Sequence, residues 1–175
     1  KQGRIAADNI CGGDSRYPGS QGSSVLKVFD LTAASTGINE TNARKSGLDA
    51  DAVILSPMSH AGYYPGGKVM TMKVVFEKGT YRLLGAQIVG YEGVDKRIDV
   101  LATAIHAGMK ATELKELDLA YAPPYSSAKD PVNMAGFMID NIAKGTLRQW
   151  RLEDAAKLPR DGSVTLLDTR TAAEF

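Results

Sequence analysis

The clearest pattern in the chain is the run of strand-forming residues over positions 68–91. Two stretches there, "KVMTMKVVFE" and "TYRLLGAQIVGY", are rich in β-branched and aromatic residues, and Lys78-Gly79 lies between them. Such residues favour strands, and a tight connection that contains glycine reverses the direction of the chain. We therefore predict an antiparallel β-hairpin at the centre of the fold.

Two further stretches are typical of strands. In "SVLKVFDLTAA", apolar Val25, Phe29 and Leu31 alternate imperfectly with polar neighbours, which predicts one strand. Another strand is predicted at "DAVILSPM", after a short polar segment that ends in glycine. Together with the hairpin, these strands indicate a sheet that is antiparallel.

After the predicted hairpin, the apolar residues along the sequence change to helical spacing. In "VDKRIDVLATAIHAG" they recur every three or four residues and stop at Gly108, so we predict an amphipathic helix packed on the sheet. His106 lies near the C-terminal end of this helix, where an imidazole can help to cap it. The predicted apolar stripe consists of Val94, Ile98, Leu101, Ala102 and Ile105.

Caps and stops predict four other helices. The best marked begins after Asp130, an N-cap followed by Pro131 at the first helical position, and ends at Gly145. With the strands, these helices predict an α+β fold, an antiparallel β-sheet with helices packed on it. The other three are expected at residues 2–11 before Gly12-Gly13, at residues 38–47, and at residues 112–117 with Thr112 as the cap.

Composition narrows the functional classes. The 175 residues suffice for one domain of ordinary size, and no apolar run is long enough to span a bilayer, so we expect no membrane partner. The net charge is +1 from 21 basic and 20 acidic residues, which leaves no global field to attract nucleic acid. The single cysteine, Cys11, excludes an internal disulfide, fits a reducing cytoplasm, and is expected to be a buried thiol.

Several catalytic patterns are missing from the sequence. Gly62, Gly66 and Gly67 lack the spacing of a dinucleotide-binding loop, and no helical pattern follows them. The two histidines, His60 and His106, lack the paired spacing of metal ligands, so no metal site is expected. No serine lies in a turn between a strand and a helix, and hydrolase chemistry finds no support.

Two polar loops braced by proline remain as candidate sites, "SHAGYYPGG" at residues 59–67 and "YAPPYSSAKDPVNM" at residues 121–134. Phenol hydroxyls donate and accept hydrogen bonds while they stay neutral, which suits them to stabilise a thiolate or a polar ring. Both loops are expected to follow strands and could meet at one edge of the sheet. Alternatively, their four tyrosines, Tyr63, Tyr64, Tyr121 and Tyr125, are aromatics of a core or an interface with a wet tip.

At this point the chain resembles a known family. The motifs "KQGRIAADNICGG", "LKVFDLTAASTGINE", "SHAGYYPGG" and "YAPPYSSAKDPVNMAG" resemble, in this order over residues 1–145, the C-terminal part of the flavin-dependent pyridine nucleotide-disulfide oxidoreductases. Within that family they are most similar to coenzyme A-disulfide reductases and the related NADH oxidases. The last motif is the most specific. In addition, "VTLLDTRTAAEF" resembles the first strand of a rhodanese domain.

The resemblance implies three parts of a longer flavoprotein. Residues 1–13 would be the last helix of the FAD-binding domain, residues 14–148 the dimerisation domain, and residues 149–175 a linker and the start of a truncated rhodanese-like domain. FAD and NAD(P)H would be held by domains upstream, so no cofactor is expected in this piece alone, which would be inactive. The redox-active cysteine also lies upstream in the family, and Cys11 does not match it.

The resemblance also implies a homodimer in which these loops complete the partner's active site. Tyr63 and Tyr121 match the two tyrosines contributed in trans to the thiol-disulfide site, with Tyr121 beside the flavin. His60 and Lys129 are implied more weakly as ligands of the substrate, with Lys129 on a phosphate of coenzyme A. The implied substrate is coenzyme A disulfide. The alternatives are an NADH oxidase or peroxidase on the same scaffold, or an interaction domain without catalysis.

Overall fold

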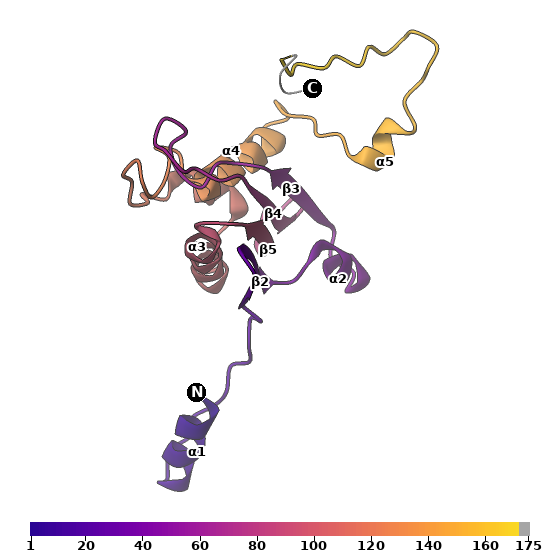
Figure 1. Ribbon diagram of the computed structural model, residues 1–175. Coiled ribbons are helices and arrows are strands. Elements are labelled where there is room, and N and C mark those ends of the chain that lie inside the picture. The colour runs from indigo at the N-terminus through magenta and orange to yellow at the C-terminus, as the bar shows by residue number, and fades with distance from the viewer. Residues whose placement is uncertain (172–175) are drawn as a thin grey trace.

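The computed structural model describes residues 1–171, and its centre is a five-stranded sheet (Figure 1). The strands lie in the order β1-β2-β5-β4-β3, and every pair of neighbours is antiparallel. The predicted α+β class and antiparallel sheet are confirmed. The strands are β1 (Ser24–Val28), β2 (Leu31–Gly37), β3 (Ala50–Leu55), β4 (Met70–Glu77) and β5 (Leu83–Gly90).

Helices cover both faces of the sheet unequally (Figure 1). The longer helices α3 and α4 pack on one face with a 3₁₀ helix, η1, and form the main core there. The short α2 covers part of the other face around Ala43 and Val75. The helices are α1 (Gln2–Ile10), α2 (Glu40–Lys45), α3 (Val94–His106), η1 (Ala111–Glu116), α4 (Pro131–Ala143) and α5 (Leu152–Ala155).

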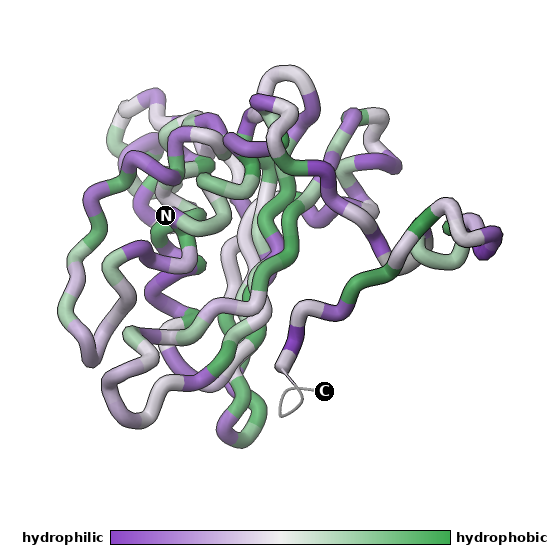
Figure 2. The backbone as a smooth tube through the Cα atoms, turned by 90° about the horizontal axis from the view of Figure 1, so that it is seen from above, coloured by the Kyte–Doolittle hydropathy of each residue, from purple (hydrophilic) through white to green (hydrophobic). Residues whose placement is uncertain are grey.

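The central strand β4 shows why the two faces differ. Its residues Met70, Met72, Val74 and Phe76 are buried on the side of α3 and α4, whereas Val75 is buried on the side of α2. Successive side chains of a strand point to opposite faces, so one strand supplies apolar side chains to both layers. Figure 2 shows hydrophobic stretches along the strands at the centre of the molecule, whereas hydrophilic and hydrophobic residues are mixed in the loops around them.

Most predicted elements are confirmed with small shifts at their ends. The hairpin predicted over residues 68–91 is β4–β5, with a register shift between Val75 and Phe76. The amphipathic helix is α3, which ends at His106 before Gly108. Asp130 caps α4 as predicted, because its Oδ1 accepts a hydrogen bond from the Val132 backbone N–H at 3.0 Å.

The prediction of one strand at "SVLKVFDLTAA" was wrong, because this stretch is the hairpin β1–β2. Val28 pairs with Leu31, and the turn consists of Phe29-Asp30 alone. Phe29 takes a φ of 52°, a left-handed conformation that usually calls for glycine or asparagine. Without such a residue the sequence carries no signal for this turn.

Thr112 was also predicted wrongly as a cap. The helix there is the 3₁₀ helix η1, its N-cap is Lys110, and Thr112 lies inside it. The Lys110 backbone N–H donates to Glu113 Oε2 at 2.7 Å, so a glutamate that reaches back closes this end.

Both ends of the chain differ from the prediction. Cys11 is exposed rather than buried, because α1 stands apart from the sheet and buries none of its residues (Figure 1). The strand predicted at the start of "VTLLDTRTAAEF" is not formed over residues 164–171, where Leu166 and Leu167 are exposed; residues 172–175 lie outside the described part. Over residues 1–171, none of the helices has the length and apolar character to cross a membrane.

The segment after α4 is anchored to the sheet by Arg151. Its guanidinium forms ion pairs with Glu40, at 2.6 Å, and with Asp51. Burial raises the pKa of Glu40, but hydrogen bonds from Lys73 and Arg151 outweigh that effect and hold this pKa below its ordinary value. A carboxylate whose pKa is lowered in the folded state stabilises the fold at neutral pH, and this contribution is lost as the pH falls through the lowered pKa.

We predict that Arg151→Ala lowers the free energy of unfolding by about 1 kcal/mol at neutral pH, because it removes the partly exposed ion pairs with Glu40 and Asp51. The difference from the wild type should shrink in acid as Glu40 becomes protonated. Chemical denaturation of both proteins at neutral and acidic pH measures it. Lys157→Ala is the control, because it removes an exposed pair with Asp154 that should contribute nothing measurable. Equal stability of the wild type and Arg151→Ala at neutral pH would contradict the anchor.

Candidate functional site

Two loops that carry tyrosines lie side by side at one end of the sheet (Figure 1). Loop A comprises residues 56–69 between β3 and β4, and loop B comprises residues 117–130 between η1 and α4. The Ala61 backbone N–H in loop A donates to the Ser126 carbonyl oxygen in loop B at 3.0 Å. The two segments therefore meet, although loop B follows a 3₁₀ helix and not a strand as expected.

The closest side-chain contact between the loops joins two phenols. Tyr63 Oη and Tyr121 Oη lie 2.6 Å apart and share a hydrogen bond. Both side chains are exposed, Tyr63 at 75% and Tyr121 at 47%. Tyr64, next to Tyr63, and Tyr125, four residues after Tyr121, are exposed as well. The loops thus present phenols to the surroundings instead of burying them in the core.

The hydrogen bond from Tyr63 raises the pKa of Tyr121, and partial desolvation adds to the effect. Tyr121 therefore remains a neutral phenol at pH 7. In a pair of hydroxyls, one O–H is used internally and the other is free to donate outward. Hydrogen bonds in a chain polarise one another, so the hydroxyl that accepts becomes the better donor. The pair can offer one strengthened proton donor to a group outside the chain.

The two weaker candidates occupy different environments. His60 is only 5% exposed; its Nδ1 lies 3.1 Å from the Ala61 carbonyl oxygen, and its ring meets Tyr64 edge to face. This buried place within loop A suits a supporting residue better than a direct ligand. Lys129 is exposed on loop B, with its ammonium nitrogen 5.3 Å from the centre of the Phe137 ring. Its charge is available to an anion in solution.

A buried arginine of α3, which the sequence did not single out, holds both loops. Arg97 is 1% exposed and pairs with Asp130, which is 3% exposed. Its Nε and Nη2 donate to Asp130 Oδ2 at 3.1 and 3.0 Å. Nη2 also donates to the Ser59 carbonyl oxygen of loop A at 2.9 Å. One guanidinium therefore contacts the helix that carries it, loop A and loop B.

Asp130 uses its remaining acceptor capacity within loop B and α4. Oδ2 accepts from Ser126 Oγ at 2.7 Å, and Oδ1 accepts from the Val132 backbone N–H. In the described part of the chain, no buried side-chain nitrogen or oxygen lacks a hydrogen-bond partner. A buried charge pair is tolerated when its polar atoms are satisfied in this way.

The sequence did contain one signal for Arg97. It lies three residues after Val94 and four before Leu101, on the apolar stripe of α3, where a solvated charge is out of place. Its partner Asp130, however, lies 33 residues further on. Neither helical periodicity nor loop composition reports so distant a contact.

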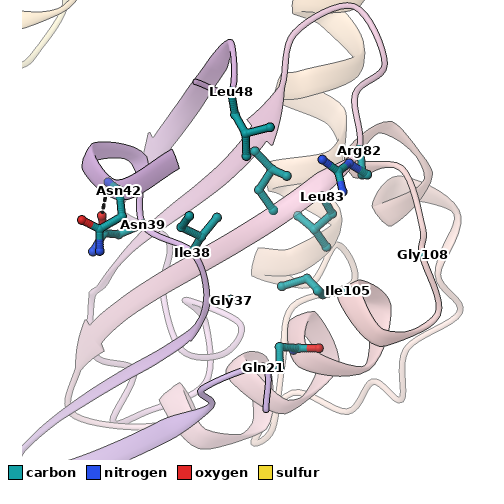
Figure 3. A pocket seen from close by; sticks show the side chains of 11 residues that line it. Gln21, Gly37, Ile38, Asn39, Asn42, Leu48, Arg82, Leu83, Ile105 and Gly108 are labelled. Atoms are coloured by element: carbon teal, nitrogen blue, oxygen red, sulfur yellow. Dashed lines mark hydrogen bonds between the residues drawn. The ribbon is translucent and has the colours of Figure 1, made fainter. Parts of the chain in front are cut away.

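A separate hollow of about 570 Å³ lies between the start of α2 and the C-terminal end of α3 (Figure 3). Ile38, Leu48, Leu83 and Ile105 provide apolar side chains, and Asn39 and Asn42 lie together at one rim, as Figure 3 shows. None of the predicted site residues lines it. Among residues 1–171, there is also no cluster of three or more histidine, cysteine or carboxylate side chains that could hold a metal ion.

We predict that Asp130→Asn destabilises the fold by about 3–5 kcal/mol, because it leaves the Arg97 charge buried without a counter-ion. Asparagine is itself a good N-cap, so the loss reports the ion pair rather than the cap. The free energy of unfolding in urea measures it. Asp118→Asn on the exposed part of loop B is the control and should be near neutral. A loss below 1 kcal/mol would contradict the proposed importance of the pair.

We predict further that Tyr63→Phe lowers the pKa of Tyr121 towards its ordinary value of about 10, since the main cause of the rise is removed. In a titration of tyrosinate absorbance of the 175-residue chain, the raised step of Tyr121, the alkaline step, should move to lower pH. Tyr125→Phe, the control, leaves both hydroxyls of the pair in place and should keep the alkaline step. An unchanged alkaline step in Tyr63→Phe would show that the two hydroxyls do not interact in solution.

Comparisons with known proteins agree on one family. Residues 23–131 match the model of the pyridine nucleotide-disulphide oxidoreductase dimerisation domain. The chain is 40% identical over 134 residues to a coenzyme A disulfide reductase of Staphylococcus epidermidis. This alignment covers 76% of this chain and 30% of that protein. The chain therefore spans about a third of the length of the curated relatives it matches.

Solved structures give the same picture. The structure of reduced Bacillus anthracis CoADR-RHD superposes with a TM-score of 0.86 at 46% identity, over 92% of this chain and 29% of that one. A NAD-dependent persulfide reductase from A. fulgidus gives a TM-score of 0.80 at 48% identity, over 84% of this chain and 28% of that one. A water-forming NADH oxidase from Lactobacillus brevis gives a TM-score of 0.77 at 25% identity, over 83% of this chain and 33% of that one.

Proposed function

This chain belongs to the pyridine nucleotide-disulfide oxidoreductase family by its dimerisation domain, and we propose that it forms part of an enzyme that reduces coenzyme A disulfide. In this proposal the chain supplies the dimer contact and two phenols, whereas FAD and NAD(P)H bind to domains upstream. The piece alone is then inactive. The residues 1–13 are the end of the FAD-binding domain, 14–148 the dimerisation domain, and 149–175 a linker towards a rhodanese-like domain.

The observation that carries the proposal is the phenol pair at 2.6 Å. Two exposed tyrosines that lie 58 residues apart in the sequence point their hydroxyls at each other. The loops that carry them are held in place by a buried ion pair. Tyrosines that served only to fill a core would be buried, and these are 75% and 47% exposed. A pre-positioned donor with a free face is what a developing anion outside the chain requires.

The chemistry of disulfide reduction gives such a donor a task. Two electrons and two protons convert one disulfide into two thiols, and FAD with NAD(P)H supplies the electrons when bound. As the S–S bond breaks, negative charge develops on the departing sulfur. The free O–H of the pair of Tyr63 and Tyr121 donates a hydrogen bond to that sulfur and stabilises the thiolate until solvent protonates it. A neutral phenol performs this role without adding a fixed charge.

The residues present fit a coenzyme A substrate in one further respect. Lys129 is exposed on the same loop as Tyr121, and an ammonium group is a suitable point charge for a phosphate. We propose that Lys129 pairs with a phosphate of coenzyme A. His60, whose buried ring packs edge to face with Tyr64, then supports loop A from within and does not touch the substrate.

We propose that the phenols act in trans, in the active site of the other subunit of a homodimer. Loops A and B lie on the outside of this domain, and the described residues contain no redox cysteine beside them, since Cys11 lies at the end of α1. The phenols therefore need a disulfide brought from elsewhere. A second subunit that carries the FAD-binding domain and its redox-active cysteine provides it.

Two other classes of substrate should be assayed beside coenzyme A disulfide. The 48% identity to a NAD-dependent persulfide reductase favours persulfide reduction as a second candidate, because a persulfide also releases a sulfur anion when its S–S bond breaks. The NADH oxidase similarity favours oxygen or peroxide less, at 25% identity. Release of coenzyme A thiol, release of sulfide and uptake of oxygen, each driven by NADH in the full-length flavoprotein, separate the three.

We predict that Tyr63→Phe combined with Tyr121→Phe in the full-length enzyme lowers turnover of coenzyme A disulfide by about 10²-fold, the usual effect of removing a donor to a developing anion. Folding, flavin content and dimerisation should persist, because both side chains are exposed. Steady-state kinetics with NADH measures the change.

The matched control is Tyr125→Phe, which removes a hydroxyl of similar exposure from loop B without touching the pair. It should retain normal turnover. If the double variant also turned over coenzyme A disulfide at the normal rate, the phenols would have no part in catalysis, and the proposed function of this site would be refuted.

A further inference from the structure

We propose that Arg97 is a positioning residue for the reaction, because its buried guanidinium sets the distance between loops A and B and so the alignment of the phenol pair. The proposal rests on the proposed function of Tyr63 and Tyr121, to which it adds the element that orients them. Arg97 itself lies beneath the loops and touches no reacting group.

The hydrogen bonds of Arg97 reach both sides of the phenol pair. On loop A it donates to the Ser59 carbonyl oxygen, four residues before Tyr63. On loop B its Nη2 lies 3.3 Å from the Tyr125 carbonyl oxygen and from Ser126 Oγ, a few residues after Tyr121. The guanidinium is planar, and acceptors in both loops fix its orientation. A shift of either loop would therefore break a hydrogen bond to Arg97.

The loops have few other means of keeping their spacing. In the described chain, two hydrogen bonds join them directly, Ala61 N–H to the Ser126 carbonyl oxygen and the phenol pair itself. Since the two tyrosines are 75% and 47% exposed, packing contributes little to fixing their rings. Lys96 adds a hydrogen bond of 3.4 Å to the Ala120 carbonyl oxygen, from the neighbouring position of α3. The same helix therefore approaches loop B on both sides of Tyr121.

The backbone before α3 makes room for this arrangement. Gly93 has a φ of 69°, and a Cβ atom there would lie 2.1 Å from Arg97 Nη1. Arg97 Nη1 instead donates to the Gly93 carbonyl oxygen at 3.2 Å. A side chain at position 93 would push the guanidinium away from the loops while leaving every charge in the protein unchanged.

Arg97→Lys tests the proposal without deleting the charge. A lysine ammonium can still pair with Asp130, but one nitrogen cannot also hold Ser59 and the loop B acceptors in a plane. In the full-length enzyme we expect folding and flavin content to persist, and kcat with coenzyme A disulfide to fall about 10- to 100-fold, as displacement of a reacting group by about 1 Å does. The KM for NADH should stay unchanged, because its binding site lies elsewhere.

A second readout is the alkaline tyrosine step in the 175-residue chain, which a merely structural residue would not move. It should shift to lower pH in Arg97→Lys and in Gly93→Ala. Two controls accompany them. Arg82→Lys makes the same exchange at an exposed arginine paired with Glu77, and Ile88→Val destabilises the core of β5. Both should keep the alkaline step, and Ile88→Val shows what a loss of stability alone does.

The outcomes separate this inference from the proposed function. If the phenol double variant loses turnover while Arg97→Lys and Gly93→Ala keep both normal kcat and the alkaline step, the positioning role is refuted and the role of the phenols stands. If the double variant keeps its turnover, the proposed function fails, whereas a shifted alkaline step in Arg97→Lys would still show that Arg97 aligns the pair. A shift in Ile88→Val as large as in Arg97→Lys would also overturn the inference.

Discussion

The structure of the site depends on one buried ion pair, Arg97 with Asp130. Removing two charges from water costs several kcal/mol for each ion, and the cost is offset only if the polar atoms find partners with good geometry. Here the partners come from α3, loop A, loop B and α4. The need to satisfy both charges therefore forces two loops from distant parts of the sequence to lie together, and the phenols that they carry meet as a result.

Asp130 connects this requirement to the rest of the fold. The same carboxylate that pairs with Arg97 also caps α4, and the Asp130 backbone N–H donates to Asn133 Oδ1 at 3.1 Å. Asn133 in turn donates to the carbonyl oxygens of Leu114 and Leu117 in and after η1. Both ends of loop B are thus held by one helix terminus. Loop A is held by the antiparallel strands β3 and β4, whose pairing brings its two ends together.

The sequence predicted the local features well, because local chemistry determines them. β-branched residues around Gly79 predicted the β4–β5 hairpin, and Asp130-Pro131 predicted the start of α4. The β1–β2 turn was missed because Phe29 adopts a left-handed conformation without being glycine or asparagine. Arg97 was missed because its role depends on a partner 33 residues away, which no periodicity reveals.

The candidate site was predictable in a different way. Resemblance to the family singled out Tyr63 and Tyr121, and the sequence alone could not say that their hydroxyls lie 2.6 Å apart. Likewise, the resemblance implied His60 as a ligand, but its burial depends on how loop A folds around it. Residue chemistry thus indicated which groups to consider, and tertiary packing decided how each one is presented.

The central claim is that the aligned phenols serve the active site of the other subunit. The most direct test mixes two impaired versions of the full-length enzyme, one with Tyr63→Phe and Tyr121→Phe and one with its redox-active cysteine replaced by serine. In a mixed dimer, phenols acting in trans meet an intact cysteine at one of the two sites, so activity should return on mixing. If exchange of subunits is verified and the mixture stays inactive, the phenols do not act across the dimer and the account is contradicted.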